Sequence, residues 1–215
     1  MISNEINNGI NGEPIIPGDK SISHRAIIIP SISNGICEIS NILNSDDVKQ
    51  TINALKSMNV KIEQNYNKLI IYGKGLNSLN KPSNYIYLGN SGTSARLLTG
   101  LLSSQKFESI LKGDHSLTNR PMSRISDPLT KMNANIKTSE GKLPIKITGT
   151  NLTPASIELK LPSAQIKSGI LLASLNTLGK TTVTEFKVTR DHTETMLEAF
   201  GANIDIRKEE NKKII

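Results

Sequence analysis

The sequence predicts an α/β domain made of three βαβαββ units, with one helix of each unit buried and the sheets on the outside. Three observations lead to this fold class. A segment that runs from a helix end into a strand recurs three times, a more apolar helical stretch precedes each copy, and no low-complexity linker separates the copies. We therefore expect one domain over residues 16–215, with units at about 16–80, 81–150 and 151–215, and an N-terminal extension over residues 1–15.

The recurring segment reads as a helix C-terminus that leads into a strand. It occupies residues 55–62, 129–136 and 197–204, and in each copy Asn or Gly stands between the helical residues and the β-branched ones. Asn and Gly most readily adopt the left-handed conformation that ends a helix. A polar turn and a second strand follow each copy, so each unit is predicted to close with a hairpin. The second strands are expected at residues 68–71, 143–147 and 212–215.

Each unit is also expected to contain two helices of different character. The first is apolar along most of its length and should lie inside the domain. The second begins with hydroxyl or acidic residues, and acids there complement the helix dipole. If the inner helices surround a pseudo-threefold axis, their N-termini meet at one end of the domain, where their partial positive charges favour an anion. The inner helices are expected at residues 23–32, 93–102 and 164–175, and the outer ones begin near 45–47, 123–127 and 191–194.

Composition narrows the class of partner. The 215-residue chain carries a net charge of +7, which suits an anionic partner. Its charges are scattered and aromatic residues make up only 3% of it, so we expect a small anion and not a nucleic acid. Cys37 is the only cysteine, which excludes a disulfide framework. Because the N-terminus is polar, with neither a cationic start nor an apolar stretch, we expect a protein that is not exported. We expect a cytoplasmic protein that does not associate with a membrane.

The first inner helix begins in the run PGDKSISHR at residues 17–25. Lys20 and Arg25 bracket Ser21 in this run, so an ammonium, a guanidinium, a hydroxyl and backbone N–H groups can converge on one anion. The alternative is an ordinary helix start with solvated charges. His24 is more simply explained as a structural residue than as an acid or base.

The second inner helix begins in GNSGTSAR at residues 89–96, where Gly92 permits close approach of a ligand and Thr93 can cap the helix. Further along, Arg120 precedes a proline, which keeps it out of a helix. A bidentate carboxylate clamp is one interpretation of Arg120, and a surface ion pair is the other.

The third inner helix begins at Ser163 and Gln165, which offer hydroxyl and amide donors, and Arg190 supplies another guanidinium later in the unit. Asp46 and Asp47 could act as paired carboxylates, although capping explains them more simply at a helix start. The sequence lacks a Walker loop, a dinucleotide fingerprint, a paired-His zinc motif and a nucleophile elbow. These absences narrow the chemistry, and no catalytic acid or base is evident.

The motifs together resemble those of the 5-enolpyruvylshikimate-3-phosphate synthase family. The resemblance covers nearly the whole chain and rests on PGDKSISHR, GNSGTSAR, LTNRPMSR, PSAQIKSGILLA and TRDHTETML, in that order. It implies one domain of the enolpyruvyl transferase fold, an inside-out α/β barrel. It also implies transfer of the enolpyruvyl group from phosphoenolpyruvate to shikimate 3-phosphate, with release of phosphate and without a cofactor.

The resemblance assigns site residues motif by motif. Lys20 would be catalytic and would touch both substrates. Gly92 would leave space that a methyl group would fill, which implies sensitivity to compact phosphonate inhibitors, and Asn90 would shape the turn. The implied ligands of shikimate 3-phosphate are Lys20, Ser21, Arg25, Ser163, Ala164, Gln165 and Arg190. Those of phosphoenolpyruvate are Lys20, Asn90, Gly92, Thr93, Arg120 and Gln165.

This chain departs from the family in length, because family members are about twice as long and carry most proton-transfer groups in a C-terminal half. Residues 1–15 would pair with that second domain, and a separate C-terminal half is a possible partner. We expect the chain alone to bind shikimate 3-phosphate weakly and to form no product. Two alternatives stay open, a stand-alone anion-binding domain and an enolpyruvyl transferase for a UDP-amino sugar.

Overall fold

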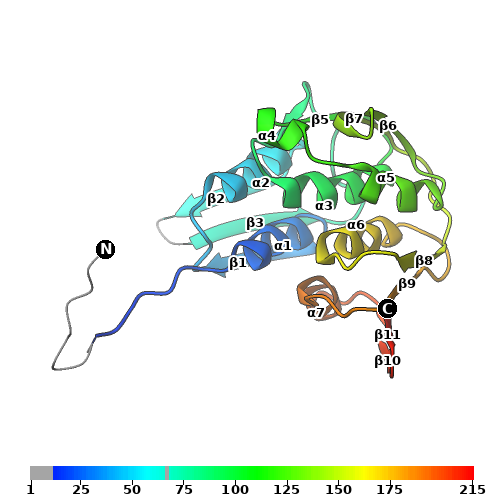
Figure 1. The fold of residues 1–215 in the computed structure, drawn as a ribbon. Helices are drawn as coiled ribbons and strands as arrows, with labels where there is room; N and C mark the ends of the chain where they lie inside the picture. Colours follow the sequence, from blue (N-terminus) through cyan, green and yellow to red (C-terminus); the bar gives the residue numbers. More distant parts are fainter. Residues whose placement is uncertain (1–11, 66–67) are drawn as a thin grey trace, which may run out of the picture.

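The computed structural model describes residues 12–65 and 68–215. Three sheets surround a centre of helices, as Figure 1 shows, and their strand orders are β1-β3-β2, β4-β5-β7-β6 and β10-β11-β9-β8. The helices are α1 (Lys20–Ser31), α2 (Asp46–Ser57), α3 (Gly92–Ser103), α4 (His115–Thr118), α5 (Ser123–Thr130), α6 (Ala164–Ser174) and α7 (His192–Ala199). The strands are β1 (Asn34–Ser40), β2 (Lys61–Asn65), β3 (Lys68–Lys74), β4 (Ile86–Tyr87), β5 (Glu108–Lys112), β6 (Asn135–Ser139), β7 (Lys142–Thr148), β8 (Ser156–Leu159), β9 (Thr182–Glu185), β10 (Arg207–Glu209) and β11 (Lys212–Ile214).

The inner helices α1, α3 and α6 form the core, as predicted. In α3, 11 of 12 residues are buried. Helices α3 and α6 cross in backbone contact, because a Cβ atom built on Gly100 would lie 1.9 Å from the carbonyl oxygen of Gly169. Side chains such as Leu98 and Ile170 are fully buried beside this crossing, and each stabilises the fold by about 2–3 kcal/mol.

The repeated helix ends take the predicted conformation. Asn59, Asn133 and Gly201 have φ values of 67°, 65° and 85°, which is the left-handed conformation of a helix C-cap. The residues that precede them differ in burial, since Met58 and Met132 are fully buried whereas Phe200 is 43% exposed. The third unit is therefore packed less deeply than the other two at this position.

Three antiparallel hairpins, β2–β3, β6–β7 and β10–β11, close the units as predicted. In β7 the residues alternate between exposed and buried, so one face of its sheet packs on the helices and the other meets solvent. The parallel pairs β4–β5 and β8–β9 complete the βαβ part of the second and third units. The fold class predicted from the sequence is confirmed.

Some local predictions were wrong or incomplete. Residues 202–206 form no strand, and β10 begins only at Arg207, so the third hairpin is shorter than expected. The short helix α4 was not predicted. Residues 12–19 carry no helix or strand, so the described part of the first unit begins with α1, and the rest of the predicted extension lies outside the described residues.

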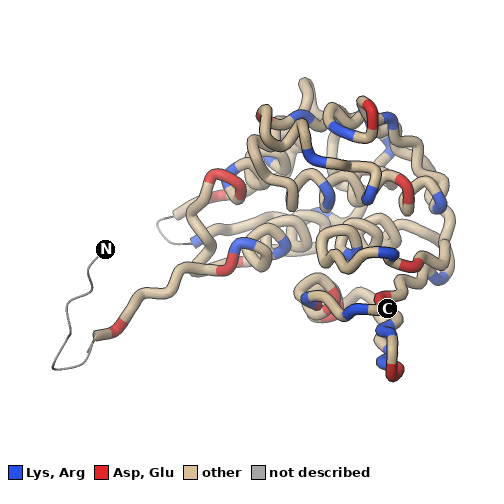
Figure 2. The backbone as a smooth tube through the Cα atoms, in the orientation of Figure 1, with Lys and Arg blue, Asp and Glu red and all other residues tan. Residues whose placement is uncertain are grey.

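Charge is spread over the surface as the sequence indicated. Figure 2 shows lysines and arginines on all sides of the domain, with acidic residues between them. Within residues 12–65 and 68–215, no helix has the length and apolar character that crossing a bilayer requires. In the same ranges, no three His, Cys, Asp or Glu side chains are grouped as metal ligands.

Candidate anion-binding site

Side-chain hydrogen bonds join the start of α1 to the loop that precedes α7, and the start of α6 to the start of α3. Nη1 of Arg190 donates to Oγ of Ser21 on α1 at 3.0 Å. Nε2 of Gln165 on α6 donates to Oγ1 of Thr93 on α3 at 2.9 Å. The structure therefore gathers the predicted helix starts at one end of the domain, where their N–H groups and dipoles favour negative charge.

Arg25 is held on three sides between α1, α6 and α7. Its Nε donates to Oγ1 of Thr193 at 2.5 Å, its Nη1 to the carbonyl of Ser21 at 2.8 Å and its Nη2 to Oγ of Ser168 at 2.6 Å. Arg25 is buried, with only 3% of its surface exposed. Burial lowers the pKa of Arg25 to about 10, and the positive charge of Arg190 acts in the same direction. Arg25 is therefore still a cation at neutral pH.

Local capping residues and a glycine shape the starts of α1 and α6. Asp19 caps α1 by accepting a hydrogen bond from the N–H of Ile22 at 2.8 Å, and this bond is the main cause that lowers the pKa of Asp19. Gly18 permits the approach, because a Cβ atom there would lie 2.1 Å from the carbonyl oxygen of Asn41. On α6, Ser163 is the N-cap and Ala164 the first helical residue.

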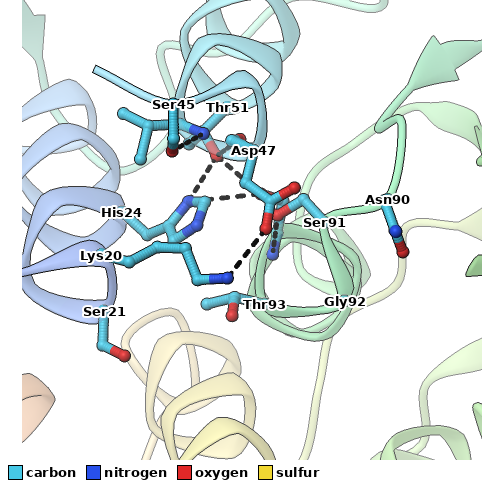
Figure 3. A network of polar contacts seen from close by, with 12 residues as sticks. Lys20, Ser21, His24, Ser45, Asp47, Thr51, Asn90, Ser91, Gly92 and Thr93 are labelled. Carbon is cyan, nitrogen blue, oxygen red and sulfur yellow. Dashed lines mark hydrogen bonds and ion pairs between the residues drawn. The ribbon is translucent and has the colours of Figure 1, made fainter. Parts of the chain in front are cut away.

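Lys20 lies at the start of α1 and faces the outer helix α2. Its Nζ is 3.1 Å from Oδ2 of Asp47, and the two side chains are 51% and 24% exposed. Figure 3 shows this pair beside Thr93 and Gly92 of α3. Ser45 is the N-cap of α2, so Asp47 pairs with Lys20 instead of capping the helix. The simpler interpretation of Asp47 as a capping residue was therefore wrong.

His24 lies beneath Lys20 in a buried polar network. Its Nδ1 is 2.7 Å from Oγ1 of Thr51, which lies 2.6 Å from Oγ of Ser94 (Figure 3). Burial lowers the pKa of His24 to about 4, with Asp47 acting in the opposite direction, so the ring is neutral at pH 7. Among the residues that the structure describes, its Nε2 has no hydrogen-bond partner. These observations favour the structural interpretation of His24.

A second group of cations lies around the start of α3. Nη2 of Arg120 donates to Oδ1 of Asn90, and Arg120 stands outside a helix, between α4 and α5, as the following proline indicated. Nη1 of Arg96 donates to the carbonyl of Gly92 at 3.0 Å and to Oε1 of Gln165 at 3.1 Å. A Cβ atom on Gly92 would lie 2.8 Å from Nη1 of Arg96 and 3.1 Å from Nη1 of Arg120. A methyl group there would displace the guanidinium groups.

The structure adds four residues to the predicted set. Thr193 and Ser168 hold Arg25, Asp47 holds Lys20, and Arg96 joins the carbonyl of Gly92 to Gln165. Arg96 ends the motif GNSGTSAR, and its position about one turn into an apolar helix was the signal that could have identified it. The partners of Arg25 come from 143 and 168 residues away, so no local pattern could have pointed to them.

A separate cavity of about 920 Å³ lies at the other end of the inner helices. Its walls include Ile29 and Ile32 near the end of α1 and Leu171 and Leu175 near the end of α6. None of the predicted site residues lines it. The candidate anion site lies at the opposite, N-terminal end of these helices.

These features define a class of protein: an α/β domain in which buried helices direct their N-termini, a lysine and several arginines at a shared anion site. A sequence profile of EPSP synthase (3-phosphoshikimate 1-carboxyvinyltransferase) matches residues 5–215. The chain belongs to the EPSP synthase family.

Individual relatives agree with the family profile. A 3-phosphoshikimate 1-carboxyvinyltransferase of Ruthia magnifica subsp. Calyptogena magnifica is 50% identical over 202 residues, which cover 94% of this chain and 46% of that protein. One from Streptococcus agalactiae serotype Ia is 46% identical and is covered to 48%. The solved EPSP synthase from Acinetobacter baumannii superimposes with a TM-score of 0.88 at 46% identity, over 95% of this chain and 47% of that structure. The chain thus spans about half the length of the relatives it matches.

Proposed function

We propose that this chain supplies the substrate-binding half of an enolpyruvyl transferase that joins shikimate 3-phosphate to phosphoenolpyruvate and releases phosphate. The observation that carries the proposal is the gathering of Lys20, Arg25 and Arg190 around the start of α1, with Arg25 bonded to α6 and the start of α6 bonded to that of α3. Both substrates are polyanions, so bringing them together requires fixed positive charge that offsets their repulsion. The family to which the chain belongs supports the same reaction.

In this proposal the Arg25 side of the site binds shikimate 3-phosphate. Arg25 pairs with its carboxylate, while Ser163 and Arg190 stand near its phosphate. The hydrogen bond between Arg190 and Ser21 supports this grouping, because it places a guanidinium and a hydroxyl at one point of the site. Ala164 and Gln165 complete the wall at the start of α6.

The start of α3 would bind phosphoenolpyruvate. Arg120 and Thr93 hold the anion, Asn90 positions Arg120, and Gly92 leaves the necessary space. Gln165 lies between the two groups, since it donates to Thr93 and accepts from Arg96. Lys20 is assigned to both substrates, because its ammonium stands at the start of α1, where its ion pair with Asp47 lies beside Thr93 and Gly92 of α3 (Figure 3).

We further infer that residues 16–215 act as one domain of three repeats and that a C-terminal half, covalent or separate, completes the enzyme. Closure of that half over the site would exclude water and add the remaining catalytic groups. The proposal includes a cytoplasmic location and no metal or organic cofactor. The isolated chain is expected to bind shikimate 3-phosphate weakly and to form no product.

Calorimetry and a product assay together test this proposal. The purified chain is titrated with shikimate 3-phosphate, with shikimate and with inorganic phosphate, and is then assayed with both substrates before and after a separately produced C-terminal half is added. We expect the tightest binding for shikimate 3-phosphate and activity only in the mixture. Product from the chain alone would contradict the proposed division of labour.

The alternatives predict other outcomes of the same experiment. A stand-alone anion-binding domain would bind shikimate 3-phosphate and gain no activity from the second half. A transferase for a UDP-amino sugar would bind that nucleotide sugar more tightly than shikimate 3-phosphate. Binding of an oligonucleotide in preference to either ligand would indicate a nucleic-acid module.

A further inference from the structure

Four charged side chains form a buried cluster behind the Arg25 side of the site. Nζ of Lys167 is 2.7 Å from Oε2 of Glu185 and 2.8 Å from Oε1 of Glu194, and Nζ of Lys213 is 3.0 Å from the same atom of Glu194. All four side chains are at most 2% exposed. Burying four charges is costly unless their geometry is well satisfied, so this cluster calls for a specific explanation.

Each helix that the cluster joins also holds Arg25 through the adjacent residue. On α6, Lys167 is followed by Ser168, which accepts a hydrogen bond from Arg25. On α7, Glu194 is preceded by Thr193, which accepts another. The hydroxyls of Ser168 and Thr193 are themselves 2.6 Å apart. A shift of α6 relative to α7 would therefore break the ion pairs and the hydrogen bonds of Arg25 together.

The cluster also reaches the loop that carries Arg190. Glu185 ends β9, and its Oε1 accepts a hydrogen bond from the hydroxyl of Thr189, the residue before Arg190. Lys213 lies on β11, which pairs with β9. Figure 1 shows α6, α7 and the sheet of β9 and β11 side by side at the end of the chain. The cluster thus fixes three elements that place the two arginines.

Charge supports the same connection. The two lysines and two glutamates of the cluster cancel, so its net charge is zero. Burial and the neighbouring Arg190 lower the pKa of Arg25, whereas Glu194 acts in the opposite direction. Within residues 12–65 and 68–215, Oε2 of Glu194 is buried and has no hydrogen-bond partner. Glu194 therefore retains an acceptor beside the buried arginine.

We propose that Lys167, Glu185, Glu194 and Lys213 are positioning residues that set the placement of Arg25 and Arg190 for the anionic substrate. The inference rests on the proposed function for the identity of that substrate. Each cluster residue acts through its neighbour, and none is assigned a contact with the ligand. Loss of one charge is expected to move α6 relative to α7 and to weaken the binding of the ligand's carboxylate and phosphate together.

Two single variants separate positioning from simple electrostatics, because they change the net charge in opposite directions. Glu194→Gln removes a negative charge and raises the net charge of the region by one, whereas Lys213→Met removes a positive charge and lowers it by one. A long-range effect on an anion would strengthen binding in the first variant and weaken it in the second. A positioning role weakens binding in both, by about tenfold for Glu194→Gln, since displacements of about 1 Å have effects of that size or larger.

The experiment measures calorimetric affinity for shikimate 3-phosphate in both variants of the full chain, together with the thermal midpoint. Two controls are matched to it. Glu209→Gln removes an exposed ion pair with Lys212 on the same hairpin, and Ile71→Val weakens the core in a different sheet. Both controls are expected to keep the original affinity, even where the midpoint falls as far as in the cluster variants.

A spectroscopic readout tests the positioning without any ligand. The Nε–H signal of Arg25 in a nitrogen-edited spectrum, assigned by its loss in Arg25→Lys, reports the hydrogen bond to Thr193. We expect this signal to shift and to exchange faster with solvent in Glu194→Gln and in Lys213→Met, and to stay unchanged in Ile71→Val.

The outcomes are distinct. Weaker binding in both cluster variants with a changed Arg25 signal supports the inference. If Glu194→Gln does not fold, the Arg25 signal of Lys213→Met decides, because both explanations weaken binding in that variant. Affinities that move in opposite directions, or an Arg25 signal that does not change in a folded cluster variant, overturn it. If the unaltered chain does not bind shikimate 3-phosphate at all, the proposed function fails, while the Arg25 signal still tests the positioning.

Discussion

The two sides of the anion site are built to different degrees. Arg25 is 3% exposed and makes three hydrogen bonds to groups on three helices. Lys20 is half exposed and pairs with a carboxylate that is itself partly exposed. Arg120 lies in the segment between α4 and α5 and donates a hydrogen bond to Asn90. Arg25 is preorganised by the domain, whereas the side chains of Lys20 and Arg120 keep contact with water.

The difference indicates which part of binding this chain can carry out alone. A preorganised guanidinium loses little conformational freedom when a carboxylate arrives. A solvated lysine gains little from an anion until water is excluded from around both. We therefore expect shikimate 3-phosphate to bind to the chain without further change, and the phosphoenolpyruvate side to need the second half.

The largest expected effect is on the preorganised side. Arg25→Gln leaves the hydroxyls of Thr193 and Ser168 without their charged donor and removes the ligand's cation. Hydrogen bonds to charged groups contribute about 1.5–3 kcal/mol each, so affinity for shikimate 3-phosphate should fall by roughly 100-fold in calorimetry. Arg207→Gln, which alters an exposed arginine paired with Asp205, is the control. A loss below threefold for Arg25→Gln would contradict the preorganised site.

The next effect concerns acid stability beneath Lys20. Burial lowers the pKa of His24 from 6.5 to about 4, so between these values the unfolded chain binds a proton that the folded chain does not. The stability that this neutral ring contributes is present above about pH 6.5 and is lost as the pH falls towards about 4, by about 3 kcal/mol in all.

Urea unfolding at pH 7, 5.5 and 4.5 measures this effect. We expect His24→Gln to flatten the pH dependence and His115→Gln, at an exposed histidine, to leave it unchanged. An equal slope in the unaltered chain and in His24→Gln would show that other groups dominate acid unfolding.

A smaller effect tests the unfinished side. Gly92→Ala places a methyl group against the guanidinium groups of Arg96 and Arg120. In an active assembly with the C-terminal half, we expect the KM for phosphoenolpyruvate to rise about tenfold and inhibition by compact phosphonates to weaken, because a shift of a few tenths of an ångström spoils bidentate geometry. Affinity for shikimate 3-phosphate in the same variant is the internal control and should stay within about twofold. An unchanged inhibition constant would contradict the steric argument.

The smallest effect is expected at the ion pair of Lys20. Asp47→Asn removes the partner of a half-exposed lysine, and such pairs contribute less than about 1 kcal/mol. The apparent affinity of the assembly for phosphoenolpyruvate should change by about threefold or less, and the change should shrink at high salt. Asp46→Asn, at a fully exposed neighbour, controls for net charge. A tenfold loss would place Lys20 on the preorganised side of the comparison.

The repeat architecture could be predicted because its signals are local. Asn59, Asn133 and Gly201 mark helix ends because Asn and Gly readily adopt the left-handed conformation. The inner helices can be predicted from their apolar composition. The first strand of the third hairpin was expected too early, because Ile204 and Ile206 favour a strand locally, whereas residues 202–206 are not paired in a sheet. Strand formation depends on such pairing more than on intrinsic preference.

The site was predicted in part for the same reason. Lys20, Arg25 and Gln165 could be found because they stand at helix starts in recognisable motifs. Their partners could not be found, because the contacts of Arg25 with Ser168 and Thr193 depend on how α6 and α7 pack. Residue types at helix starts are encoded locally, whereas the hydrogen bonds that aim them are set by tertiary structure.

The contact between Gly100 and Gly169 has a consequence for how the protein can change over evolutionary time. Because α3 and α6 are in backbone contact, they form one rigid unit, and Thr93 and Gln165 lie at the N-terminal ends of its two helices. Neither residue can change its position through a shift of its own helix alone. We therefore expect adaptation to a new ligand to proceed through the side chains of these two positions. If the proposed function holds, a change there that favours one substrate should also alter the binding of the other.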